Sequence, residues 1–173
     1  IIVVGETSTN GNDFAVLRYN ADGSLDSSFG GGDGIVTTDF AGGSFDVAYR
    51  VVIQADGRIV VGGASGSGTT DFAVARYLAD GSLDNSFSGD GKQTVDLAGS
   101  VDEGLGLALD ATGRIIQVGA AAVGGQQDFG VVRYNSDGSL DTSFSGDGKL
   151  TTAVGTQWDI AQDVAVQAGG RIV

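Results

Sequence analysis

The stretch Asp13-Phe-Ala-Val-Leu-Arg-Tyr19 decides the fold of this chain because it returns twice. It recurs as Asp71-Phe-Ala-Val-Ala-Arg-Tyr77 and as Asp128-Phe-Gly-Val-Val-Arg-Tyr134, at shifts of 58 and 57 residues. A long period that is kept this closely is typical of repeat architectures, in which each repeat is one supersecondary unit. The three copies therefore predict one structural unit that is built three times.

Alternate side chains of this stretch lie on opposite faces of an expected β-strand. In the first copy Phe14 and Val16 point to one side. Ala15, Leu17 and Tyr19 point to the other side. Because both faces are apolar, the sheet must be covered on both sides, whereas a sheet with one wet face alternates apolar and polar residues.

The second repeat predicts four strands that are joined by tight turns. Asp56-Gly57 and Asp80-Gly81 are turn signals, and residues 63–70 form a loop rich in Gly, Ser and Thr. Strands rich in β-branched and aromatic residues are expected at 46–54, 58–62, 71–77 and 92–97. We expect an all-β protein, a β-propeller of four-stranded antiparallel blades with about three blades in this chain. A parallel β-solenoid is the alternative, but it has shorter coils and fewer hairpins.

The whole chain, residues 1–173, is expected to form one repeat domain. Its three tandem units of 57–58 residues cover about 6–62, 63–119 and 120–173, the last completed by a strand like 1–5. Because Ile1–Gly5 aligns with 115–119 and Arg171–Val173 with 114–116, the chain begins and ends inside the same strand. Propellers typically have about four to eight blades. We therefore expect a segment of a larger propeller, or half of a dimeric one whose ring closes by self-association.

Composition excludes several classes of chemistry. The net charge of −13 leaves no basic surface for nucleic acid or for an anionic membrane. Cys and His are both absent, so this chain offers no disulfide, zinc cluster or Cys–His nucleophile. No apolar run approaches the roughly 20 residues that span a bilayer, so no membrane insertion is expected. Of the 22 acidic residues only Glu6 and Glu103 are glutamates, and this preference for Asp favours turns over helices.

The combined motifs resemble the bacterial delta-60 type repeat. They are Asp-Phe-Ala-Val-x-Arg-Tyr, Asp-Gly-Ser-Leu-Asp-x-Ser-Phe, Gly-Asp-Gly and x-Asp-Gly-Arg-Ile-Val-Val-Gly-Gly, and they cover essentially the whole chain. The resemblance implies a β-propeller in a secreted or surface protein of a bacterium, with a scaffold or binding role. It implies no catalytic residues.

Two kinds of acidic turn are candidate cation sites. Asn20–Asp26 and Asn135–Asp141 have the pattern Asn-x-Asp-Gly-x-x-Asp, which resembles the later part of a calcium loop. The middle copy has Leu78 instead of an oxygen ligand, and hairpin turns with a capping Asp explain the same residues without an ion. A second set is expected to bond mainly to backbone amides: Asp33, Asp90 and Asp147. No metal or cofactor site is therefore assigned, and calcium remains an alternative.

Arginines recur in step with the repeat, and a buried Arg needs a paired carboxylate. Arg18, Arg76 and Arg133 lie within strands, and a second set follows the hairpin turns: Arg58, Arg114 and Arg171. We expect their partners to be Asp46, Asp102 and Asp159. A ring of arginines that binds an anionic ligand in the central channel is the alternative.

The sequence predicts a non-catalytic structural or interaction module with no catalytic residues. The Asp residues repeat in every unit, whereas catalysis usually needs one unique acid pair. The alternative is a propeller that binds protein or carbohydrate through loops that differ between repeats, at residues 7–12, 65–70 and 121–127. A propeller lyase or hydrolase is a third class. Of the unique residues Glu6, Glu103, Gln126, Gln127 and Trp158, the tryptophan is expected to pack in the core or at a blade edge.

Overall fold

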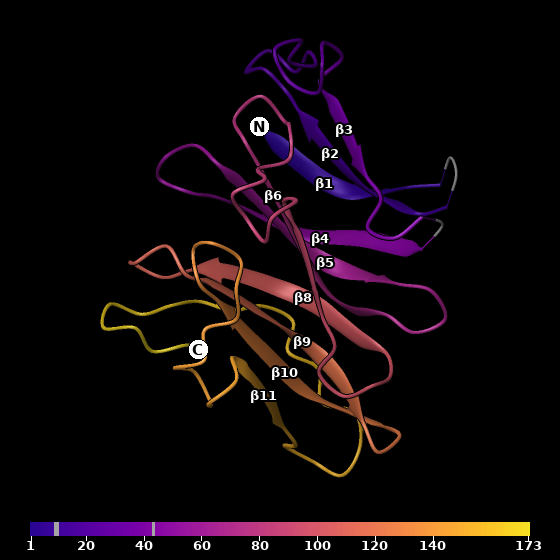
Figure 1. Ribbon diagram of the computed structural model, residues 1–173, viewed down its shortest axis with the longest axis vertical. Coiled ribbons are helices and arrows are strands. Elements are labelled where there is room, and N and C mark those ends of the chain that lie inside the picture. Colours follow the sequence, from indigo (N-terminus) through magenta and orange to yellow (C-terminus); the bar gives the residue numbers. More distant parts are fainter. Residues whose placement is uncertain (9–10, 43) are drawn as a thin grey trace.

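Three antiparallel sheets make up the computed structural model, which describes residues 1–8, 11–42 and 44–173. The first contains β1 (Ile2–Thr7), β2 (Asp13–Arg18) and β3 (Ile35–Thr38). The second contains β4 (Phe45–Ile53), β5 (Ile59–Gly66), β6 (Asp71–Tyr77) and β7 (Lys92–Val95). The third contains β8 (Asp102–Leu109), β9 (Ile115–Val123), β10 (Gln126–Tyr134) and β11 (Lys149–Thr152). Figure 1 shows the sheets stacked from the top of the view to the bottom, in chain order. They are blades of a β-propeller, as the sequence predicted.

Both faces of the middle blade are buried, which confirms the prediction from strand alternation. Ala73 and Ala75 pack toward the first blade with Phe14, Val16 and others. Phe72 and Val74 pack toward the third blade. All four of these β6 side chains are fully buried. Apolar burial on two sides of a single sheet is therefore what holds consecutive blades together.

The strands and turns follow the prediction, with longer hairpins at two places. Residues 63–66 of the predicted loop 63–70 belong to β5. In the predicted loop 121–127, residues 121–123 belong to β9 and 126–127 to β10, so only Gly124 and Gly125 turn the chain. Gly and small residues there are compatible with strand pairing once a neighbouring strand supplies hydrogen bonds, which local composition does not reveal.

Each complete blade carries an irregularity in its first strand. The register of β4 against β5 shifts between Ala48 and Arg50, and that of β8 against β9 shifts between Gly104 and Gly106. A Cβ on Gly63 or Gly119, opposite these bulges, would lie 1.8 Å from a backbone oxygen. Glycine is therefore required at positions 63 and 119, because the bulged strand comes too close for any side chain.

Residues after β11 return along the third blade. The amide of Ala161 donates to the carbonyl of Gly119 (3.3 Å), and Val166 bridges Ile172 in a short antiparallel hairpin. Among the described residues, no helix is long and apolar enough to cross a membrane.

Candidate functional site

The blades have two chemically different ends. The turn end carries the Asp-Gly-Ser-Leu-Asp turns at 22–26, 80–84 and 137–141. The loop end carries the connections that follow β5 and β9, and β2 begins there. Asp71 begins β6 at the loop end, and Arg76 lies near its other end.

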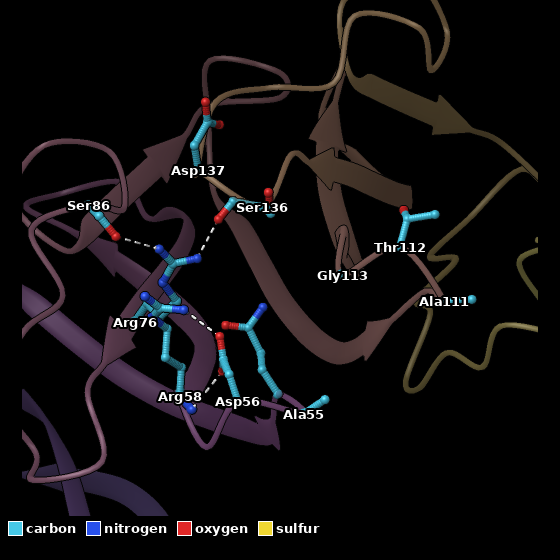
Figure 2. A pocket seen from close by; sticks show the side chains of 11 residues that line it. Ala55, Asp56, Arg58, Arg76, Ser86, Ala111, Thr112, Gly113, Ser136 and Asp137 are labelled. Atoms are coloured by element: carbon cyan, nitrogen blue, oxygen red, sulfur yellow. Dashed lines mark hydrogen bonds and ion pairs between the residues drawn. The ribbon is translucent and has the colours of Figure 1, made fainter.

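At the turn end, Arg76 holds two blades together. Its Nε donates to Asp84 (2.9 Å), its Nη2 donates to the hydroxyl of Ser86 (3.1 Å), and its Nη1 donates to the backbone oxygen of Ser136 in the next blade. Figure 2 shows Arg76 between the two serines. The guanidinium carbon also lies 4.8 Å from the centre of the Phe87 ring. Arg76 and Asp84 are each only 4% exposed, so this ion pair is shielded from solvent.

The same network recurs in the flanking blades. Arg18 donates to Asp26 (2.8 Å), Ser28 and the backbone oxygen of Ala79 in the second blade. In the third blade, Arg133 donates to Asp141 (2.8 Å) and to the hydroxyl of Ser143 (3.0 Å), and it lies over the Phe144 ring. Each Arg therefore has one acid eight residues later.

The expectation that Arg18, Arg76 and Arg133 pair with Asp46, Asp102 and Asp159 is wrong. The turn after β6 folds back so that Leu83 bridges Tyr77, which brings Asp84 opposite Arg76. Asp46, Asp102 and Asp159 lie at the loop end, where they accept backbone hydrogen bonds from Phe40, Leu97 and Val154 respectively.

The hairpin arginines extend the network at the turn end. Arg58 pairs with Asp56, and its Nε lies 2.8 Å from Asp84, an ion pair without hydrogen-bond geometry. Arg114 pairs with Asp110 (2.6 Å) and with Asp141 (3.2 Å). Arg171 is exposed in the C-terminal hairpin, and its carbonyl accepts from the amide of Gln167.

Contacts within the network hold its carboxylates in the charged form. Burial raises the pKa of Asp84, but hydrogen bonds from Ser86 and the charges of Arg76 and Arg58 outweigh burial, so this pKa lies below its ordinary value. At Asp110 burial is likewise outweighed by hydrogen bonds from Thr112 and Arg114, which lower the pKa to about 2. These groups remain anionic near neutral pH and do not act as proton donors.

An open hollow of about 570 Å³ lies beside this network, between the second and third blades. Figure 2 shows Arg58 and Arg76 on one side of it and Thr112 and Gly113 across from them. Both arginines are already paired with carboxylates. The hollow therefore offers no uncompensated cation among the described residues that line it, and the contacts favour a structural role for the turn end.

The predicted cation-binding turns make local hydrogen bonds. Asp22 and Asp137 each accept from the amide and the hydroxyl of a serine two residues later. Asp33, Asp90 and Asp147 each accept from the amide two residues later, which confirms the predicted backbone role. These contacts are those of Asx turns.

At the loop end the blades differ from one another. Trp158 is 73% exposed, so the prediction that it packs in the core or at a blade edge is wrong. The positions that correspond to it, Phe45 and Val101, are also exposed, at 49% and 37%. A shallow hollow of about 260 Å³ brings Trp158 beside Gln126 and Gln157.

The other unique residues lie at the same end. The carboxylate of Glu6 accepts a hydrogen bond from the side-chain amide of Asn12 (2.8 Å). The backbone carbonyl of Gln127 accepts one from the backbone amide of Asp159 (2.7 Å). Glu103 is half-buried in β8. In the predicted loop 7–12, residues 9 and 10 lie outside the described residues.

Two groups of three aspartates at the loop end were missed by sequence reasoning. They are Asp13, Asp39 and Asp46, and Asp71, Asp96 and Asp102, in each of which one oxygen per residue lies within 4.8 Å of the others. Successive members are 26 and 7 positions apart in the first triad and 25 and 6 positions apart in the second, so no short sequence motif contains all three. The repeat period could have revealed them, because the first triad recurs in the second.

Stacked antiparallel sheets that repeat three times define a β-propeller repeat protein. The chain belongs to the family described as a domain of unknown function (DUF5122) beta-propeller, whose model matches residues 1–29, 54–87 and 111–144. These segments, together more than half of the chain, contain the three repeated ion pairs Arg18–Asp26, Arg76–Asp84 and Arg133–Asp141. No curated protein matches the chain.

Proposed function

We propose that this chain is a non-catalytic structural and interaction module of the delta-60 repeat type, from a secreted or surface protein of a bacterium. The contrast between the two ends supports this proposal. Polar residues at the turn end repeat and satisfy one another, whereas the loop end differs from blade to blade. A scaffold with one constant end and one variable end suits recognition of another protein.

Among the described residues, the acids of the turn end repeat from blade to blade, which favours a role without catalysis. Asp26, Asp84 and Asp141 occupy the same place in each blade and are each paired with an arginine. A general acid needs a carboxyl whose pKa is raised toward neutrality, and the pKa of each of these three carboxyls is lowered.

Recognition of carbohydrate is the second candidate, and one observation favours it. Trp158 is exposed and lines a hollow together with Gln126 and Gln157. An aromatic face with amide donors and acceptors at its rim can stack on a sugar ring and bond to its hydroxyls.

A glycan array read with labelled protein separates these functions. For a protein-binding scaffold we expect no saturable glycan signal. Trp158 is the only tryptophan, so its fluorescence reports directly on the loop end. A glycan that binds saturably and shifts this emission, and that no longer binds Trp158→Ala, would establish the carbohydrate function. Cleavage of any arrayed glycan would overturn the non-catalytic proposal.

A further inference from the structure

Each aspartate triad joins two consecutive blades at the loop end. Asp13 begins β2 and Asp39 follows β3, both in the first blade. Asp46 belongs to β4 of the second blade. One oxygen from each of the three side chains lies within 4.8 Å of the others. In the next pair of blades the same positions are Asp71, Asp96 and Asp102.

One carboxylate oxygen in the first triad is buried without a partner. Asp46 is 0% exposed, and its Oδ2 accepts from the amide of Phe40 (2.8 Å). Its Oδ1 is inaccessible to solvent and has no hydrogen-bond partner. A buried anionic oxygen without a donor is costly unless a positive charge satisfies it. Asp46 therefore brings a buried carboxylate oxygen without a hydrogen-bond donor to the cluster.

In the second triad both oxygens of Asp102 have donors: Oδ1 accepts from the amide of Ala122 (3.0 Å), and Oδ2 accepts from the amide of Leu97 (2.8 Å). The unpartnered oxygen here belongs to the neighbouring residue Thr70. Thr70 directly precedes Asp71, and its backbone carbonyl accepts a hydrogen bond from the backbone amide of Asp102 (2.7 Å). The hydroxyl oxygen of Thr70 is also buried without a hydrogen-bond partner. Unsatisfied buried polar atoms are uncommon in folded proteins, and both triads have one in or next to them.

Electrostatic repulsion acts within both triads. Burial, together with the charges of Asp39 and Asp46, raises the pKa of Asp13. Burial and the charges of Asp96 and Asp102 do the same to Asp71. The nearby ammonium groups of Lys92 and Lys149 donate to the backbone oxygens of Asp39 and Asp96.

We propose that each triad binds one calcium ion, which ties a blade to the next. The ligands are all carboxylate oxygens, and Ca²⁺ prefers such hard ligands at about 2.3–2.6 Å. Two oxygens on opposite sides of one ion are then about 4.6–5.2 Å apart, so one ion can contact all three side chains. Backbone oxygens and water supply the remaining ligands. These residues are distinct from the turn motifs at 20–26 and 135–141.

The third blade provides a control within the chain. Asp128 and Asp159 correspond to Asp13 and Asp46, but Ala153 stands where Asp39 and Asp96 stand. Asp159 is exposed. With two acids instead of three, this position is expected to bind no ion, so the described chain has two sites.

Isothermal titration of chelator-treated protein with CaCl₂ tests the assignment. We expect two calcium ions per chain and a higher melting temperature in Ca²⁺ than in chelator. Asp13→Asn removes one site, and Asp13→Asn with Asp71→Asn removes both. Asp33→Asn has the same charge change outside the triads and keeps two sites. Ala153→Asp creates a third.

The metal-free melting temperature shows that a loss of binding is not a loss of folding. Because each Asn relieves repulsion, Asp13→Asn and Asp71→Asn are expected to melt higher than the parent in chelator and to gain less from Ca²⁺. Absence of saturable calcium heat and of a calcium-dependent melting shift would overturn the proposal. So would two calcium sites in the double variant, or binding of Mg²⁺ without Ca²⁺.

Discussion

Among single residues, the aspartates divide into two groups whose protonation has opposite effects on stability. In the first group, hydrogen bonds and arginine charges lower the pKa below the unfolded value of 3.8 by more than burial raises it. This group contains Asp84, Asp110 and Asp141. Asp13 and Asp71 have raised pKa values because burial and neighbouring acids act together. The first group stabilises the folded state when ionised, and the second destabilises it.

Acid is therefore expected to unfold the protein through the turn end. A carboxyl whose folded pKa is depressed contributes stability above its unfolded pKa of 3.8 and loses it as the pH falls through the folded pKa. For Asp110 this window extends from about pH 4 to about pH 2. Melting temperatures measured across this range in chelator should fall steeply. Asp110→Asn should melt lower than the parent at pH 5 and lose less on acidification; an equal loss in both proteins would contradict the assignment.

Sequence reasoning at this scale succeeded where the chemistry is local. One set of carboxylates accepts a hydrogen bond from the backbone amide two residues later, and the turn pattern predicts such local bonds. These carboxylates are Asp33, Asp90 and Asp147. It failed where the fold brings distant groups together. The pairing of Arg76 with Asp84 depends on how the intervening turn folds back, and the triads depend on contact between blades.

The turns and strands were largely predictable because every repeat contains Asp-Gly motifs that mark its turns. What the sequence could not show is that the Asp-Gly-Ser-Leu-Asp turn packs against a Phe ring of the preceding blade in the second and third blades but has open space in the first. Gly23 and Gly81 have similar positive φ angles of 86° and 92°. A Cβ on Gly81 would lie 2.8 Å from the Phe29 ring of the preceding blade, whereas a Cβ on Gly23 meets nothing within 4 Å.

These two glycines allow the contact between blades to be measured separately from backbone strain. Both Gly23→Ala and Gly81→Ala place an L-residue at positive φ, at a cost of about 1–2 kcal/mol. Gly81→Ala also forces the turn away from Phe29, and overpacking of this kind adds about 1–3 kcal/mol. Chemical denaturation should show the larger loss for Gly81→Ala. Equal losses would mean that the turn can move without disturbing the preceding blade.

In the molecule as a whole, the described part of the first blade lacks the innermost strand that β4 and β8 provide in the other two blades, so one edge of β1 is unpaired. Val3 corresponds to Val61 and Gln117 in the other blades, which are fully buried, yet Val3 is 46% exposed. In those blades β4 or β8 pairs with the equivalent strand, and in the described residues β1 pairs with β2 alone. Residues 159–167 have the sequence of such an inner strand, and they lie beside the third blade.

We predict that β1 pairs with an inner strand like 159–167, supplied by a further repeat or by a second copy of the chain. An open edge with exposed apolar residues is a template for strand addition. In solutions of the 173-residue chain a second copy can supply this strand. The mass measured by light scattering should then rise with concentration, and the amides of β1 should become protected from exchange. Val3→Lys should weaken both effects. The control is Val154→Lys, at a valine after β11 that is 69% exposed, and this substitution should weaken neither effect. If the amides of β1 exchange equally fast at every concentration, closure through this edge is wrong.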